Sequence, residues 1–271
     1  MQQKSICFIG GGNMAQAIIF GLLNKGYPPE KITVCDPNEE KRTLFSVRGV
    51  QVSPPNIERV KSAEVIVFAV KPQAAAEVCE SLSSVDFSDK LLISIMAAIS
   101  CKKLTALLSN ANHIVRVMPN TPALVSEGMS GLFANTTLLP EYKSFAEHLL
   151  NTIGKTCWVE NEQDMHAVTA ASGSSPAYFF LFMEAMQKAL LKMGLSEEQT
   201  RILVQQSALG AAKMAVENPQ ISFSTLRENV TSKGGTTAAA LDVFNQRALT
   251  KIVEEAMQAC VLRSKEMEKL F

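Results

Sequence analysis

The pattern of apolar and polar residues changes character near residue 162. Before that point short apolar runs alternate with helical periodicity, and after it helical patterns dominate. Continuous apolar runs of this kind are typical of parallel strands covered on both faces. The expected strands are Ser5–Ile9, Ile32–Asp36, Glu64–Val70, Leu91–Met96, His113–Met118 and Thr156–Val159. The pattern therefore predicts an α/β fold, with a doubly wound parallel sheet of the Rossmann type over residues 1–162.

Residues 163–271 predict an all-helical second domain. Small residues at 172–178 should break or kink a helix, and Tyr178–Met193 is apolar almost all round. Such a helix has to be buried on most sides, and a small helical domain offers few positions that do so. We therefore expect a partner chain to cover it. Ser196 and Gln199 form a capping-box pattern for the next helix, and Ala248–Leu270 predicts a long amphipathic one.

The first expected strand leads into a glycine turn, Gly10–Ala15, with the sequence GGGNMA. A strand, a glycine turn, a helix and a second strand ending in an acid form the dinucleotide-binding fingerprint in its required context. Loops that follow parallel strands meet at one edge of a sheet, so they should line one crevice. The expected cofactor-binding residues are Gly10, Gly12, Asn13, Met14, Ala15, Asp36, Asn38, Val70, Lys71, Pro72, Met96, Ala97 and Asn120.

Three of these assignments have competing interpretations. Asp36 can accept a hydrogen bond from a ribose 2′-hydroxyl, which favours NADH, whereas Asn38 with Lys41 and Arg42 can hold the 2′-phosphate of NADPH. The choice of coenzyme is left open. Lys71 is a candidate charged catalyst, but we favour a role in which its backbone positions the ribose. Asn120 can donate toward the nicotinamide or hold the turn around Pro119 and Pro122.

A hydroxyl-rich box, Val230–Thr237, precedes another helical pattern, Ala238–Phe244. A helix N-terminus offers unpaired N–H groups and a partial positive charge, which suit a carboxylate or a phosphate. Glycines allow close approach, and Ser and Thr hydroxyls add donors. The alternative is an ordinary loop with an N-cap.

Composition excludes several classes of function. Lys plus Arg equal Asp plus Glu at 26 each, so no basic field points to nucleic acid. No apolar run is long enough to cross a membrane. The 6 cysteines are scattered without a CxxC pair, which is typical of reduced thiols in a cytoplasmic protein. The 3 histidines show no ligand spacing, so no metal is expected, and His166 is interpreted as a packed histidine at the domain junction.

Four segments together resemble the pyrroline-5-carboxylate reductase family. They are Gly10–Ala15 (GGGNMA), Ala69–Gln73 (AVKPQ), Arg116–Ala123 (RVMPNTPA) and Asn229–Thr237 (NVTSKGGTT). The resemblance implies a Rossmann domain, a helical dimerisation domain and a homodimer that can assemble further. It also implies that NADH or NADPH reduces 1-pyrroline-5-carboxylate to proline. Two departures are visible: Ser175 stands where the family commonly has glycine, and Asp36 differs from the polar or basic residues often seen there in members that prefer NADPH.

This chemistry assigns roles within the box. The substrate carboxylate should be fixed by Ser232, Gly234, Gly235 and Thr237, and Thr237 can also donate toward the ring nitrogen, which makes it the candidate catalytic residue. A protonated imine already carries the needed proton, so a strong protein acid is unnecessary. A β-hydroxyacid dehydrogenase is the alternative enzyme, but its lysine is missing after Pro176. A non-catalytic dinucleotide sensor is the alternative outside enzymes.

Overall fold

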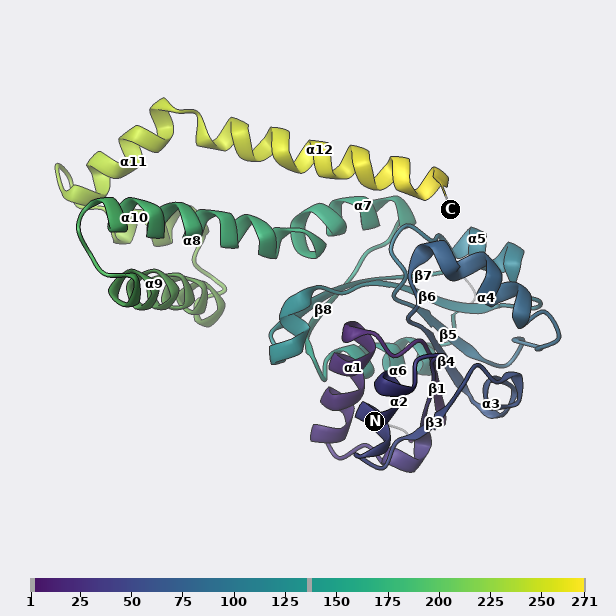
Figure 1. Ribbon diagram of the computed structural model, residues 1–271. Helices are drawn as coiled ribbons and strands as arrows, with labels where there is room; N and C mark the ends of the chain where they lie inside the picture. The colour runs from purple at the N-terminus through teal and green to yellow at the C-terminus, as the bar shows by residue number, and fades with distance from the viewer. Residues whose placement is uncertain (1–2, 136–137, 271) are drawn as a thin grey trace. The chain divides into compact units, whose positions relative to one another are not determined.

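The computed structural model describes residues 3–135 and 138–270, which divide into two compact units. The first unit runs up to Ser174 and includes the chain from Cys260 onward, and the second is Ser175–Ala259 (Figure 1). The division thus falls later than the predicted boundary at 162, which stays a prediction. Among the described residues, no helix is long and apolar enough to span a membrane.

The described part of the first unit contains one eight-stranded sheet with the strand order β3-β2-β1-β4-β5-β6-β7-β8. The strands up to β6 are parallel, whereas β7 pairs antiparallel with β6 and parallel with β8. The order reverses between β1 and β4, as in a doubly wound Rossmann sheet, so the predicted fold class is confirmed. The strands are β1 Ile6–Ile9, β2 Ile32–Cys35, β3 Gln51–Ser53, β4 Val65–Phe68, β5 Leu91–Ser94, β6 His113–Met118, β7 Gly128–Ala134 and β8 Gly154–Trp158.

Helices cover both faces of this sheet because alternate strand residues point to opposite sides. In β1, Ile6 and Phe8 join the core beneath α1 and α6, and Cys7 and Ile9 join the core beneath α4 and α5 (Figure 1). The helices of this unit are α1 Asn13–Asn24, α2 Glu39–Ser46, α3 Ile57–Ser62, α4 Ala75–Ser81, α5 Cys101–Leu107, α6 Pro140–Leu150 and α7 Met165–Val168. This layering leaves the carboxyl ends of the parallel strands available for a site.

The second unit is helical, as predicted. Its helices are α8 Ser175–Lys192, α9 Glu197–Glu217, α10 Phe223–Asn229, α11 Thr236–Gln246 and the first part of α12 Leu249–Leu270. Ser196 and Gln199 form the predicted capping box of α9. A turn of π-helix at Thr169–Gly173 precedes α8, where small residues predicted a kink. Ser175 opens α8 without a positive φ, so the position that is often glycine does not need one here.

The apolar helix α8 is not covered by its own chain. Phe179, Phe180 and Leu181 are 65%, 62% and 67% exposed. Phe182 does contact the Phe244 ring of α11, with the ring centroids 6.0 Å apart, inside the range of about 4.5–7 Å that aromatic pairs prefer. This exposure agrees with the expectation that a partner chain, and not the rest of the same chain, covers the helix.

Candidate active site

The loops that follow β1, β2, β4 and β5 are joined at one edge of the sheet. The Gly10 amide donates to the Cys35 carbonyl at 2.8 Å, and the Ala69 amide donates to the Ile9 carbonyl at 2.8 Å. The Ile95 amide continues this pattern toward the Phe68 carbonyl at 3.1 Å. Because all these strands are parallel, the predicted cofactor residues of the first unit follow strand ends at the same edge of the sheet.

The glycine turn has the geometry of a pyrophosphate cradle. Gly10 has a φ of +101°, and a Cβ there would lie 2.6 Å from the Ala69 carbonyl oxygen. At Gly12, by contrast, a Cβ would meet nothing within 4 Å, so the turn faces open space. Gly12 starts α1 with no side-chain cap and no acidic residue in the first turn. Backbone N–H groups at such a helix start suit an anion, and the cradle therefore fits a dinucleotide.

Asp36 links the glycine turn to the loop after β2. Its side chain is 7% exposed, and its Oδ2 accepts from the Gly11 amide at 2.7 Å. Its Oδ1 accepts from the Asn38 amide at 2.8 Å, and Asn38 in turn caps α2 by accepting from the Lys41 amide at 3.0 Å. Three hydrogen bonds thus fix the loop where the fingerprint expects the adenosine ribose.

The other predicted cofactor residues show mixed exposure. Asn13 and the side chain of Lys71 are exposed, whereas Ala15 and Met96 are buried. Lys71 precedes a short helical turn, Pro72–Ala74, and its side chain forms no ion pair with any residue that the structure describes, which agrees with the interpretation of a backbone role. Val70 and Ala97 are half-buried beside them.

The amide of Asn120 is engaged within the first unit. Its Oδ1 accepts from the Met129 amide at 2.8 Å, and its Nδ2 donates to the Ser172 carbonyl at 3.2 Å. These contacts tie β7 to the segment before α8, and they favour the interpretation in which Asn120 holds the turn after β6.

The box in the second unit forms an open helix start. Gly234 has a φ of +72°, which favours glycine, and Gly235 is the N-cap of α11 without a side-chain hydrogen bond. No acidic residue lies in the first turn, and the side chains of Ser232 and Thr237 are exposed. The Thr231 hydroxyl is different, because it donates to the Arg227 carbonyl at 2.6 Å. The hydroxyls of Ser232 and Thr237 therefore lie in a setting suited to a carboxylate.

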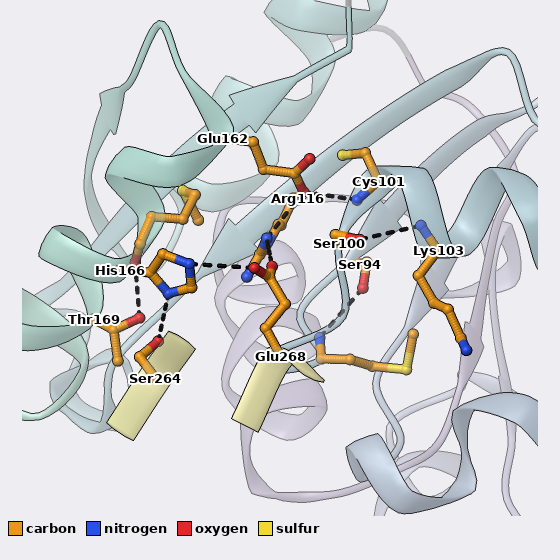
Figure 2. Close-up of polar contacts among 12 residues, drawn as sticks. Ser94, Ser100, Cys101, Lys103, Arg116, Glu162, His166, Thr169, Ser264 and Glu268 are labelled. Carbon is orange, nitrogen blue, oxygen red and sulfur yellow. Dashed lines mark hydrogen bonds and ion pairs between the residues drawn. The ribbon is translucent and has the colours of Figure 1, made fainter. Parts of the chain in front are cut away.

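A buried charged cluster, which sequence reasoning missed, lies within the first unit (Figure 2). Arg116 on β6 is 5% exposed and pairs with Glu162 at 2.9 Å and with Glu268 of α12 at 2.7 Å. His166 is 2% exposed, and it contacts Glu268 at 3.2 Å and the Ser264 hydroxyl at 2.9 Å. Arg116 interrupts an otherwise apolar strand sequence, and this was the feature of the sequence that could have indicated a buried charged cluster. His166 is a packed histidine, as expected.

Two buried thiols flank these features without being poised to react. Burial, and then the neighbouring Glu162 carboxylate, raise the pKa of Cys101 to about 12. The Cys7 and Cys35 sulfurs lie 3.8 Å apart behind the glycine turn. The hydrogen bond to Cys35, followed by burial, raises the pKa of Cys7. Neither Cys7 nor Cys101 is therefore a ready thiolate nucleophile at neutral pH.

The doubly wound sheet, the open glycine turn and the acid after β2 define a dinucleotide-binding oxidoreductase of the Rossmann class. Residues 5–98 match the family described as NADP oxidoreductase coenzyme F420-dependent. Residues 162–267 match the family described as pyrroline-5-carboxylate reductase dimerisation.

Three comparisons extend over at least 98% of the chain. A pyrroline-5-carboxylate reductase of Pasteurella multocida is 64% identical, with 100% of each chain covered. The structure of a pyrroline-5-carboxylate reductase from Coxiella burnetii has a TM-score of 0.93 at 40% identity and covers 98% of this chain and 99% of that one. A Plasmodium falciparum pyrroline carboxylate reductase with NADP bound has a TM-score of 0.87 at 32% identity, with 99% of each covered. The chain belongs to the pyrroline-5-carboxylate reductase family.

Proposed function

We propose that this chain transfers a hydride from NADH or NADPH to the C=N bond of 1-pyrroline-5-carboxylate, giving L-proline. The observation that carries this proposal is the 64% identity to a named reductase over the whole chain. The geometry supports it with an open glycine turn in the first unit and an uncapped, hydroxyl-rich helix start in the second.

The first unit supplies the residues that would hold the coenzyme. Gly12 leaves room for the pyrophosphate, and the start of α1 offers it N–H donors. Asp36 and Asn38 lie where the adenosine ribose is expected, and Val70–Pro72, Met96 and Ala97 line the same sheet edge. When bound, the reduced nicotinamide supplies the hydride.

The second unit supplies the residues that would orient the substrate. The Ser232 and Thr237 hydroxyls and the N–H groups at the start of α11 would bind the substrate carboxylate. Gly234 leaves the approach open, and the missing side chain of Gly235 leaves room for the Ser232 hydroxyl. Each hydrogen bond to a charged group contributes about 1.5–3 kcal/mol. Losing two of them would therefore weaken binding by orders of magnitude.

Thr237 is the proposed catalytic residue. Its hydroxyl would donate toward the ring nitrogen, or toward proline as it forms. When the cyclic imine is protonated, its nitrogen has no free lone pair, so the Thr237 hydroxyl would accept a hydrogen bond from the N–H and orient the ring. The imine then already carries the proton that the product needs, and Thr237 does not have to act as a strong acid.

We also propose a homodimer in the cytoplasm. The match to a dimerisation family over 162–267 and the exposed aromatic side chains of α8 support the dimer. An exposed apolar surface of this kind is normally covered in an oligomer. The cytoplasmic location is inferred from the cysteines, which are scattered and form no disulfides in the structure.

Replacing Thr237 with alanine tests the substrate site. Thr237→Ala should lower kcat/KM for pyrroline-5-carboxylate by at least about tenfold, because a bond of about 1.5–3 kcal/mol is lost. The dissociation constant for the coenzyme, measured without substrate, should not change. Thr231→Val is the matched control, since its hydroxyl is already bonded to Arg227. A collapse of coenzyme binding in Thr237→Ala, or equal losses in both variants, would refute this placement.

The alternative of a β-hydroxyacid dehydrogenase lacks its catalytic group. Such an enzyme needs a lysine early in the helix after Pro176, but the first lysine of α8 is Lys188, which is exposed and paired with Glu184 one turn away. A non-catalytic sensor would not need the open box at α11.

A further inference from the structure

The carboxylate of Asp36 is held rigidly between two loops. Gly11 donates to one of its oxygens and Asn38 to the other, at 2.7 and 2.8 Å. Each carboxylate oxygen can accept further hydrogen bonds. Because two backbone amides hold the group, it cannot swing away from a ligand that lies over the glycine turn.

The two cations that follow Asp36 are placed differently. The Nη1 of Arg42 donates to the Asp36 and Pro37 carbonyls at 2.7 and 2.9 Å, so Arg42 stabilises the loop backbone. The Nζ of Lys41 lies 3.9 Å from the Asp36 Oδ2, and the Lys41 side chain is 47% exposed. Lys41 is thus a long, solvated cation that can turn from the carboxylate toward a nearby anion.

We propose that Asp36 and Lys41 together select between the two coenzymes, with NADH preferred and NADPH admitted. This inference rests on the proposed coenzyme site. A fixed carboxylate accepts a hydrogen bond from a ribose 2′-hydroxyl but repels a 2′-phosphate, which carries nearly two negative charges. The Lys41 side chain offsets this repulsion by turning from the Asp36 carboxylate to pair with the 2′-phosphate of NADPH. NADH has no 2′-phosphate, so Lys41 does not stabilise its binding in this way.

The selector predicts opposite effects for two substitutions. Asp36→Asn should raise the ratio of NADPH affinity to NADH affinity by at least about tenfold, because it removes the repelling charge. Lys41→Gln should lower the same ratio by about threefold or more, because it removes the compensating cation. Glu40→Gln is the matched control for Asp36→Asn, since Glu40 is exposed on the same helix as Lys41 and its replacement removes one negative charge as well. Its ratio should stay at the wild-type value.

The measurement is the dissociation constant of each reduced coenzyme, from its fluorescence on binding, with no substrate present. The ratio of kcat/KM with NADPH to kcat/KM with NADH should change in the same direction as the ratio of the two affinities. Wild-type protein that binds NADPH more tightly than NADH would overturn the proposal. An equal loss of affinity for NADH and NADPH in Asp36→Asn would also overturn it, because Asp36 would then serve only to hold the two loops together.

Lys41→Gln keeps the test decisive if Asp36→Asn fails to fold. Lys41 is exposed, so its substitution should leave the unfolding temperature unchanged, and an unchanged ratio in that variant would refute the selector. If the protein binds NADH more tightly than NADPH, and the variants change this ratio as predicted, but it does not reduce pyrroline-5-carboxylate, the role of Asp36 and Lys41 is supported and the proposed function is refuted. Wild-type protein that binds neither coenzyme would refute both.

Discussion

Gly10 and Gly12 lack side chains for different physical reasons. At Gly10 the backbone has a φ of +101°, and an added Cβ would strike the Ala69 carbonyl at 2.6 Å. At Gly12 an added Cβ would enter empty space, so the fold itself has no need of glycine there. The first glycine is thus required by the fold, and the second is explained by a ligand that approaches the backbone.

This difference predicts separate effects of two substitutions. Gly10→Ala should destabilise the protein by about 1–3 kcal/mol, because it combines a clash with a strained backbone. Gly12→Val should leave the unfolding free energy close to the wild type and abolish coenzyme binding. Urea denaturation and coenzyme titration measure the two quantities. Intact coenzyme affinity in Gly12→Val would argue against the cradle.

The glycines and Asp36 could be predicted because the fingerprint fixes their spacing along the chain. The engagement of Asn120 could not, because its partners Met129 and Ser172 come from separate segments. The different placements of Lys41 and Arg42 also depend on side-chain geometry, which adjacent positions in a sequence do not distinguish.

Among the elements, α12 is anchored at its C-terminal end by the cluster of Arg116, Glu162, His166 and Glu268. Arg116 lies between two carboxylates and is 5% exposed. Glu162 also accepts from the Cys101 amide at 2.7 Å at the start of α5. One arginine therefore joins β6, α5 and α12 within the first unit.

Removing that arginine should be costly. Arg116→Met leaves two partly buried carboxylates without their cation, and we expect a loss of about 3–5 kcal/mol of unfolding free energy in urea denaturation. Arg263→Met is the matched control on α12, because Arg263 pairs with Glu266 at the surface, where such pairs contribute about 0–1 kcal/mol. Similar small losses in both variants would contradict the anchoring role.

The strands at the parallel core were predicted from their apolar runs, but β3 and β7 were not. β3 has three residues at the sheet edge, and β7 (GMSGLFA) contains two glycines that weaken the strand pattern. β7 also reverses direction after the short helical turn Thr121–Val125, whereas the sequence pattern suggested a parallel sheet throughout. The contact of Glu268 with Arg116 could not be predicted either, because the sequence does not distinguish Glu268 from the other polar residues of the amphipathic helix α12.

At the scale of the whole molecule, the division into a sheet unit and a helical unit followed from the change in periodicity. The return of α12 to the first unit did not, because a continuous helix carries no signal at Cys260. The apolar surface of α8 was predicted to need a cover, and the chain itself leaves it exposed. The molecule that performs the chemistry is accordingly proposed to be a dimer.

The proposed function requires the coenzyme to bind at the glycine turn and the substrate carboxylate to bind at the start of α11. A crystal structure with oxidised coenzyme and L-proline tests it most directly. We predict the proline carboxylate on the Ser232 and Thr237 side chains and the α11 N–H groups, with the proline ring against the nicotinamide of the same or the partner subunit. Proline bound away from Ser232 and Thr237, or a nicotinamide remote from every copy of α11, would contradict the account.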